Sequence, residues 1–94
     1  MARQPLTGAE ISQALDELAG WEVNDGKLQK TFQFPSFAEA IGWMVSVAVY
    51  ADKLDHHPDW SNVYNKVFVE LITHDLGALS RLDAELATRM DALS

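Results

Sequence analysis

The stretch Asp52-Lys53-Leu54-Asp55-His56-His57-Pro58-Asp59-Trp60 decides where this chain changes from helix to strand. Pro58 fixes its own φ and disfavours helical geometry for His57, so a helix arriving from the N-terminal side must end here. The stretch also holds two of the three histidines in the chain. Imidazole can give and take a proton near neutral pH, so histidines at a helix end suit acid–base chemistry.

The segment before this joint predicts a long helix from Phe37 to Lys53. Ser36 and Glu39 have the spacing of a capping box at its start. Apolar residues recur at helical spacing, and further apolar positions widen the stripe: Phe37, Ala40, Ile41, Met44, Val45 and Ala48, then Trp43, Val47, Val49 and Tyr50. Two readings stay open, a central helix in an ordinary core and a helix whose extra apolar surface mediates self-association.

The remaining elements follow from caps, alternation and turn residues. Thr7-Gly8-Ala9-Glu10 is a capping-box pattern that opens a helix, and Gly20 ends it. Asp25-Gly26 is a hairpin dipeptide between two alternating segments. We therefore predict strands at Trp21–Asn24 and Leu28–Phe34, a second hairpin of Trp60–Tyr64 and Val67–Ile72 around an Asn65-Lys66 turn, and a last helix capped by Ser80 and Asp83.

This order, α-β-β-α-β-β-α, predicts a single domain over residues 1–94. Strands that arrive as hairpins form an antiparallel sheet, and amphipathic helices must cover one of its faces. The predicted fold class is therefore α+β, a two-layer sandwich of a four-stranded antiparallel sheet with three helices on one face.

Composition excludes several classes of function. A formal charge of −7 with no basic cluster argues against nucleic-acid binding. The chain has no cysteine, which excludes disulfides and thiolate chemistry. No signal peptide and no stretch long enough to span a membrane is apparent, so we expect a cytoplasmic protein without a membrane partner. Phosphate loops and nucleophile elbows are missing too, which leaves noncovalent proton transfer for an enzyme.

The histidines themselves allow three interpretations: acid and base, metal ligands, or unrelated surface residues. Adjacent side chains such as His56 and His57 diverge at a helix end, which counts against one shared metal ion. His56 could instead cap the helix C-terminus as a cation. Asp52 and Asp55 are either solvated carboxylates or groups that orient an imidazole. For Trp60 and Tyr64, packing is favoured over a stacking platform for a ring.

Taken together, these residues resemble the pterin-4a-carbinolamine dehydratases. An acidic residue, His-His-Pro, an aromatic residue, then a distant His and Asp stand at that family's spacing; here they are Asp52, His56-His57-Pro58, Tyr64, His74 and Asp83. Neighbouring segments also resemble the family: Gly20-Trp21, Lys53-Leu54-Asp55, Asn62 to Val67 and Thr73-His74. The resemblance covers nearly the whole chain.

The resemblance implies the dehydration of 4a-hydroxytetrahydrobiopterin to quinonoid dihydropterin and water, which recycles the pterin used by aromatic amino acid hydroxylases. It implies no metal and no cofactor, because the pterin is the substrate. His57 would be the acid at the leaving hydroxyl, with His56 and His74 binding pterin and assisting the other proton. The residues implied to line the pterin site are Asp55, His56, His57, Thr73, His74 and Asp75, supported by Asp52, Pro58, Tyr64 and Asp83.

Family members are commonly tetramers built partly through the central helix, so the resemblance implies a dimer or tetramer through residues 37–53. It also raises a rival function. Animal members double as dimerisation cofactors of a homeodomain transcription factor, and a docking module of that kind would use the same helix. Docking needs only the helix face, whereas catalysis needs His57.

Overall fold

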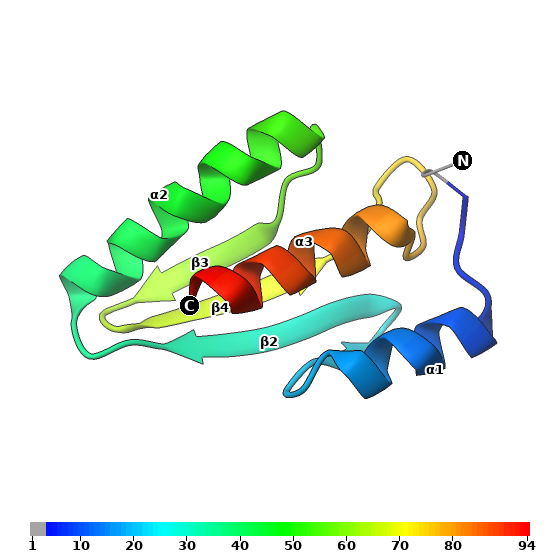
Figure 1. The fold of residues 1–94 in the computed structure, drawn as a ribbon, viewed down its shortest axis with the longest axis horizontal. Coiled ribbons are helices and arrows are strands. Elements are labelled where there is room, and N and C mark those ends of the chain that lie inside the picture. The colour runs from blue at the N-terminus through cyan, green and yellow to red at the C-terminus, as the bar shows by residue number, and fades with distance from the viewer. Residues whose placement is uncertain (1–3) are drawn as a thin grey trace.

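A computed structural model describes residues 4–94 (Figure 1). It contains three helices and four strands, and none of the helices within those residues is long and apolar enough to cross a membrane. In chain order the elements are α1 (Gly8–Glu17), β1 (Glu22–Asn24), β2 (Lys27–Gln33), α2 (Phe37–Leu54), β3 (Asp59–Val63), β4 (Lys66–Leu71) and α3 (Arg81–Leu93). The predicted element order is confirmed.

The four strands form one antiparallel sheet in the order β1-β2-β4-β3. Each hairpin supplies two neighbouring strands, and the long central pair joins β2 to β4 with Leu28 opposite Leu71. Val67, Val69 and Leu71 are buried on the helix-covered face, whereas Phe68 is 40% exposed on the other face. The fold is therefore the predicted two-layer α+β sandwich.

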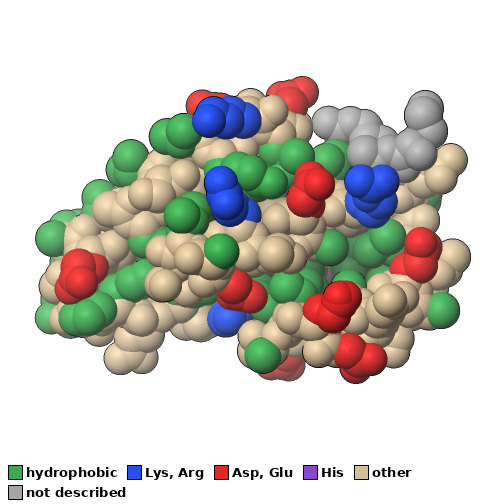
Figure 2. Space-filling model, in the orientation of Figure 1, with side chains coloured by type: hydrophobic (Ala, Val, Ile, Leu, Met, Phe, Trp, Pro, Cys, Tyr) green, Lys and Arg blue, Asp and Glu red, His purple; other side chains and the backbone are tan. Residues whose placement is uncertain are grey.

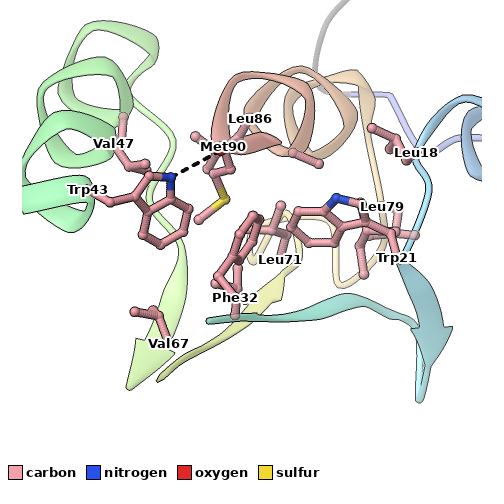
Figure 3. Close-up of a cluster of buried hydrophobic side chains, with 14 of the residues drawn as sticks. Leu18, Trp21, Phe32, Trp43, Val47, Val67, Leu71, Leu79, Leu86 and Met90 are labelled. Atoms are coloured by element: carbon pink, nitrogen blue, oxygen red, sulfur yellow. Dashed lines mark hydrogen bonds between the residues drawn. The ribbon is translucent and has the colours of Figure 1, made fainter. Parts of the chain in front are cut away.

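Tryptophan and phenylalanine side chains fill the space between the sheet and the helices (Figure 3). The Trp43 ring from α2 lies 4.4 Å from the Phe32 ring of β2, centroid to centroid. Its indole Nε1–H donates a 3.1 Å hydrogen bond to the carbonyl oxygen of Met90 in α3. A buried indole needs such a partner, so Trp43 fixes α2 and α3 relative to each other as well as filling the core.

The core-facing side of α2 differs from the main apolar stripe predicted from helical spacing. Its buried residues are Ala40, Trp43, Val47 and Ala51, whereas Phe37, Ile41, Val45 and Val49 are between 37% and 59% exposed. The helical spacing of apolar residues could not predict which side of α2 faces the core, because both sides are apolar. Trp43 and Val47, which were predicted only to widen the stripe, are among the residues that pack in the core.

The turn of the second hairpin lies one residue earlier than predicted. Val63 pairs with Lys66, so the turn residues are Tyr64 and Asn65, and Tyr64 has a φ of +53°. The Asn62 side-chain amide donates to the carbonyl oxygens of Tyr64 and Lys66, at 3.0 and 2.9 Å. These bonds hold an aromatic residue in a left-handed conformation that such residues seldom adopt.

Two of the three predicted capping boxes are confirmed, at Thr7 with Glu10 and at Ser80 with Asp83. The third is incomplete. Ser36 Oγ accepts from the Glu39 amide, but the Glu39 carboxylate bonds back to the Ser36 hydroxyl at 3.1 Å. The sequence spacing is that of a capping box, yet the second bond goes to the side chain and not to the backbone.

Asp91, near the end of α3, links the helix to the first hairpin. Its Oδ1 pairs with Lys30 Nζ at 2.7 Å, and its Oδ2 accepts from Trp21 Nε1 at 3.0 Å. Lys30 interrupts the apolar face of β2 between the buried Leu28 and Phe32. β1 pairs with β2 only as far as Gln29. Lys30 is the next residue, and from there on β2 pairs with β4 alone.

Candidate functional site

The site is built where α2 ends and β3 begins. Asp55 adopts a left-handed conformation at φ +53° and ψ +42°, and its backbone N–H bonds the carbonyl oxygens of Ala51 and Asp52. The His56 N–H also bonds the Ala51 carbonyl, at 3.1 Å. These bonds satisfy the last helix carbonyls and turn the chain sharply. Pro58 then leads into β3, so His56 and His57 lie on a fixed corner.

His56 points into the protein and is 6% exposed. Its Nε2 lies 2.6 Å from Oδ1 of Asp83, in the first turn of α3. Among the interpretations left open for His56, the structure does not favour a charged cap of α2, because Nε2 bonds a carboxylate of another helix. His56 is therefore held by a buried partner that lies 27 residues further along the chain.

His57 has the opposite environment. Its side chain is 58% exposed and its Nε2 lies 2.9 Å from Oδ1 of Asp52, in the last turn of α2. Of the two interpretations left open for Asp52, this contact favours a group that orients an imidazole. His57 thus combines a carboxylate partner with access for a small molecule.

His74 follows β4 in a tight turn closed by the Thr73–Ala78 bridge. Its side chain is 68% exposed, and its Nε2 lies 3.1 Å from Oδ2 of Asp59. Asp59 was not among the predicted site residues. Its signal lies in the hairpin register, since Asp59 pairs with Glu70 and residues past the end of β4 must continue alongside the His57–Pro58 corner.

Hydrogen bonds join the α2–β3 corner, which carries His56 and His57, to the turn after β4, which carries His74. Thr73 Oγ1 donates to Oδ2 of Asp83 at 2.8 Å, while Oδ1 of the same carboxylate binds His56. Asp59 and His74 form a second link on the surface. These two links hold the α2–β3 corner and the turn after β4 next to each other.

The other predicted site residues lie outside the three histidine–aspartate pairs. Asp55 and Asp75 are exposed within the two corners, and Pro58 is half-buried between His57 and β3. The Thr73 side chain is fully buried and bonded to Asp83, so it cannot line a substrate site directly. Tyr64 is 66% exposed beyond the far end of β3 from His57, so within one chain it does not reach the histidines.

The chemistry available here is that of imidazoles paired with carboxylates. Each histidine has its own aspartate, one pair buried and two on the surface. Among residues 4–94, no group of three or more His, Asp or Glu side chains is placed to hold a metal ion. Asp59 also lines an open hollow of about 610 Å³ on the uncovered face of the sheet. Positioned proton transfer is the chemistry that such pairs provide.

The chain was compared with known families and curated proteins. A family profile described as pterin 4 alpha carbinolamine dehydratase matches residues 4–93. A relative from Rhizorhabdus wittichii, provisionally named as a pterin-4-alpha-carbinolamine dehydratase, is 46% identical over 96 residues, covering 100% of this chain and 99% of the relative. A relative with the same provisional name from Ruegeria pomeroyi is 57% identical over 76 residues, covering 79% of this chain and 78% of the relative.

Two solved structures are similar. A transcriptional coactivator/pterin dehydratase from Brucella melitensis superposes with a TM-score of 0.93 at 41% identity, covering 96% of this chain and 98% of its own. A pterin dehydratase-like protein identified as a RuBisCO assembly factor in the alpha-carboxysome has a TM-score of 0.64 at 23% identity, with 78% and 84% coverage. The second similarity concerns the fold alone.

Proposed function

Because this chain belongs to the pterin 4 alpha carbinolamine dehydratase family, we propose that it dehydrates 4a-hydroxytetrahydrobiopterin to quinonoid dihydropterin and water. In this step the bond between C4a and its hydroxyl oxygen breaks, the hydroxyl leaves with an added proton, and N5 gives up its proton as the C=N bond forms. The pterin is the substrate, and the proposal needs no metal and no cofactor. The observation that carries it is the set of three imidazole–carboxylate pairs at neighbouring corners.

His57 is the acid that protonates the departing hydroxyl. Its side chain is exposed, so a substrate can reach it, and the 2.9 Å bond to Asp52 limits its orientations. A positioned acid or base of this kind is worth about 10²–10⁴-fold in rate. The effect is largest when the reacting atoms are held in place beforehand, which is what the rigid end of α2 provides.

His56 and His74 bind the pterin and handle the proton from N5. His56 is rigid because of its buried bond to Asp83, and His74 is exposed beside Asp59. Asp55 and Asp75 border the same corners and complete the proposed pterin site. Through this reaction the protein would recycle the pterin cofactor of aromatic amino acid hydroxylases, in the cytoplasm and as a dimer or tetramer joined through residues 37–53.

The test is the rate at which freshly generated 4a-hydroxytetrahydropterin dehydrates with and without the protein, after treatment with a chelator. We expect acceleration that survives the chelator and that His57→Ala removes. No acceleration by a folded protein would overturn the proposed activity. Acceleration that disappears with the chelator and returns on adding a metal would overturn the metal-free mechanism.

A second candidate function is docking of a partner on α2. Phe37, Ile41, Val45 and Val49 form an exposed apolar stripe along this helix, and Figure 2 shows hydrophobic side chains along α2 at the upper left. An exposed stripe of this kind marks an interaction surface, between copies of this chain or with another protein. Docking would survive His57→Ala and fail when the stripe is made polar, so the two functions separate by mutation.

A further inference from the structure

Four buried polar side chains, His56 among them, form one hydrogen-bonded network. They come from the α2–β3 corner, from the end of β4 and from the start of α3: His56 at 6% exposed, Thr73 and Ser80 at 0%, and Asp83 at 1%. Every buried side-chain nitrogen and oxygen within residues 4–94 has a hydrogen-bond partner. A buried network with all members satisfied is rigid, so the direction of each bond within it has consequences.

The number of protons on each hydroxyl fixes which group donates and which accepts in each bond. Oδ2 of Asp83 accepts from the Ser80 backbone N–H at 2.9 Å and from the Thr73 hydroxyl at 2.8 Å. A hydroxyl has one proton, so Thr73 must be the acceptor in its 2.6 Å contact with the Ser80 hydroxyl. Ser80 Oγ in turn accepts from the Leu82 N–H at 3.2 Å. The chain of bonds therefore runs from Ser80 to Thr73 to Asp83.

This arrangement leaves Oδ1 of Asp83 for His56. The carboxylate lies in the first turn of α3, where the helix dipole stabilises a negative charge. An ionised carboxylate only accepts hydrogen bonds, so His56 Nε2 carries the proton in the 2.6 Å bond. The nitrogen that remains for another partner is Nδ1.

We propose that Ser80 and Thr73 are positioning residues: they fix the Asp83 carboxylate, which holds His56 as its Nε2–H tautomer and leaves Nδ1 as the acceptor for the pterin N5 proton. The use of Nδ1 rests on the proposed dehydratase function, whereas the tautomer does not. Ser80 was not predicted as a site residue, and Thr73 was expected to line the substrate. Both act through Asp83 and neither touches the pterin.

Asp83→Asn tests the tautomer directly. The Ser80 N–H and the Thr73 hydroxyl both need an acceptor, so the new amide keeps its oxygen on their side. Its NH₂ then faces His56, whose Nε2 must accept, and the proton moves to Nδ1. An Asp→Asn change that imposes the wrong tautomer on a serine-protease histidine costs about 10⁴-fold in kcat, and we expect a loss of about 10²–10⁴-fold in kcat here.

The measurement is ¹⁵N NMR of the histidine side chains, which distinguishes protonated from bare ring nitrogens, together with dehydration kinetics. We expect Nε2–H at His56 in the wild type, Nδ1–H in Asp83→Asn, and no change in the spectra of His57 and His74. Asp91→Asn is the matched control: it alters a carboxylate two turns further along α3 that bonds Trp21 and Lys30 but no histidine. It should leave the tautomer of His56 and the rate unchanged.

Thr73 offers a second pair of variants if Asp83→Asn does not fold. Thr73→Val keeps the shape but removes the hydroxyl that fixes Oδ2, so the Asp83 carboxylate can turn away from His56 Nε2. We then expect mixed tautomers at His56 and a lower kcat with little change in KM. Thr73→Ser keeps the hydroxyl and should restore both. A residue that only stabilised the fold would lower the melting temperature without changing the ¹⁵N spectrum.

The outcomes separate the two proposals. Nδ1–H at His56 in the wild type, or Nε2–H in a folded Asp83→Asn protein, overturns the positioning network. A tautomer switch with an unchanged rate overturns the assignment of Nδ1 as the acceptor. If the wild-type protein does not dehydrate the pterin at all, the proposed function fails, while the NMR result still decides whether Ser80 and Thr73 fix His56.

Discussion

Alanine substitutions at the two adjacent histidines should destabilise the fold to different extents. His57 is exposed, and its bond to Asp52 joins it to a carboxylate that is itself 79% exposed. Exposed pairs of this kind contribute about 0.2–1 kcal/mol, so His57→Ala should lower the free energy of unfolding by no more than about 1 kcal/mol. For a domain of 60–100 residues that corresponds to at most about 4–8 °C in Tm.

His56→Ala removes a buried partner of a buried carboxylate. The side chain of Asp83 is 1% exposed and would lose the hydrogen bond to its Oδ1. A buried charged acceptor that loses its donor costs more than the about 1–3 kcal/mol of a neutral group. Because Ser80 and Thr73 still donate to Oδ2, we expect about 3 kcal/mol, or a fall of roughly 12–24 °C in Tm.

The assay compares thermal unfolding by circular dichroism with the dehydration rate for the wild type and both variants, in one buffer and at one protein concentration. His57→Ala should retain its fold and lose about 10²–10⁴-fold in rate. Comparable falls in Tm for the two variants would refute the division into a buried and an exposed histidine. A folded His57→Ala protein with full activity would refute the role of His57 as the acid.

Three further predictions concern the scaffold. Asp91→Ala removes acceptors for Lys30 Nζ and Trp21 Nε1, so urea titration should show a loss of about 1–3 kcal/mol; an unchanged midpoint would contradict the link between α3 and the first hairpin. Thr7→Ala removes the N-cap of α1 and should cost about 1 kcal/mol in the same titration, whereas no loss would mean that α1 does not depend on its cap. Val45→Glu places a charge on the exposed stripe of α2, where Val45 is 59% exposed, and light scattering should show a smaller assembly that is still folded by circular dichroism; a wild-type monomer at micromolar concentration would refute self-association.

Local signals predicted where most elements begin and end. Thr7 and Ser80 start helices with capping boxes, and Asp25-Gly26 forms a turn with φ of +53° and +74°. These signals depend on neighbouring residues only, so the sequence contains them completely. The end of α2 was predicted for the same reason, because Pro58 prevents its continuation.

Pairing between strands was harder to predict, as the second hairpin shows. Placing the turn at Asn65-Lys66 instead of Tyr64-Asn65 shifts the pairing of β3 and β4 by two residues. Because side chains alternate with period two, a shift of two residues leaves each one on its own face. Val67 and Val69 therefore share one face in either register, and that face is buried. Tyr64 was misplaced at the end of a strand because no local signal favours a left-handed aromatic residue.

The face of α2 could not be predicted from α2 alone. Trp43 and Val47 are buried because Phe32 from β2 and Met90 from α3 provide their surroundings. A helix that is apolar on two sides needs a second surface in contact before one side becomes the core. The other side, with Phe37, Ile41, Val45 and Val49, stays exposed within one chain.

The partner of His56 shows most clearly what sequence spacing leaves out. Ser80 and Asp83 predicted a helix start, and that cap uses the Ser80 N–H and Oδ2 of Asp83. The pattern does not reveal that Oδ1 of the same carboxylate points to a histidine on another element. The Asp83 side chain thus accepts from the Ser80 N–H at the start of α3 and also bonds His56 in the proposed site. A shift of α3 would therefore shift His56 as well. A substitution at Asp83 should therefore affect helix stability and His56 together, whereas Asp52 and Asp59, on the surface, affect only their own histidines.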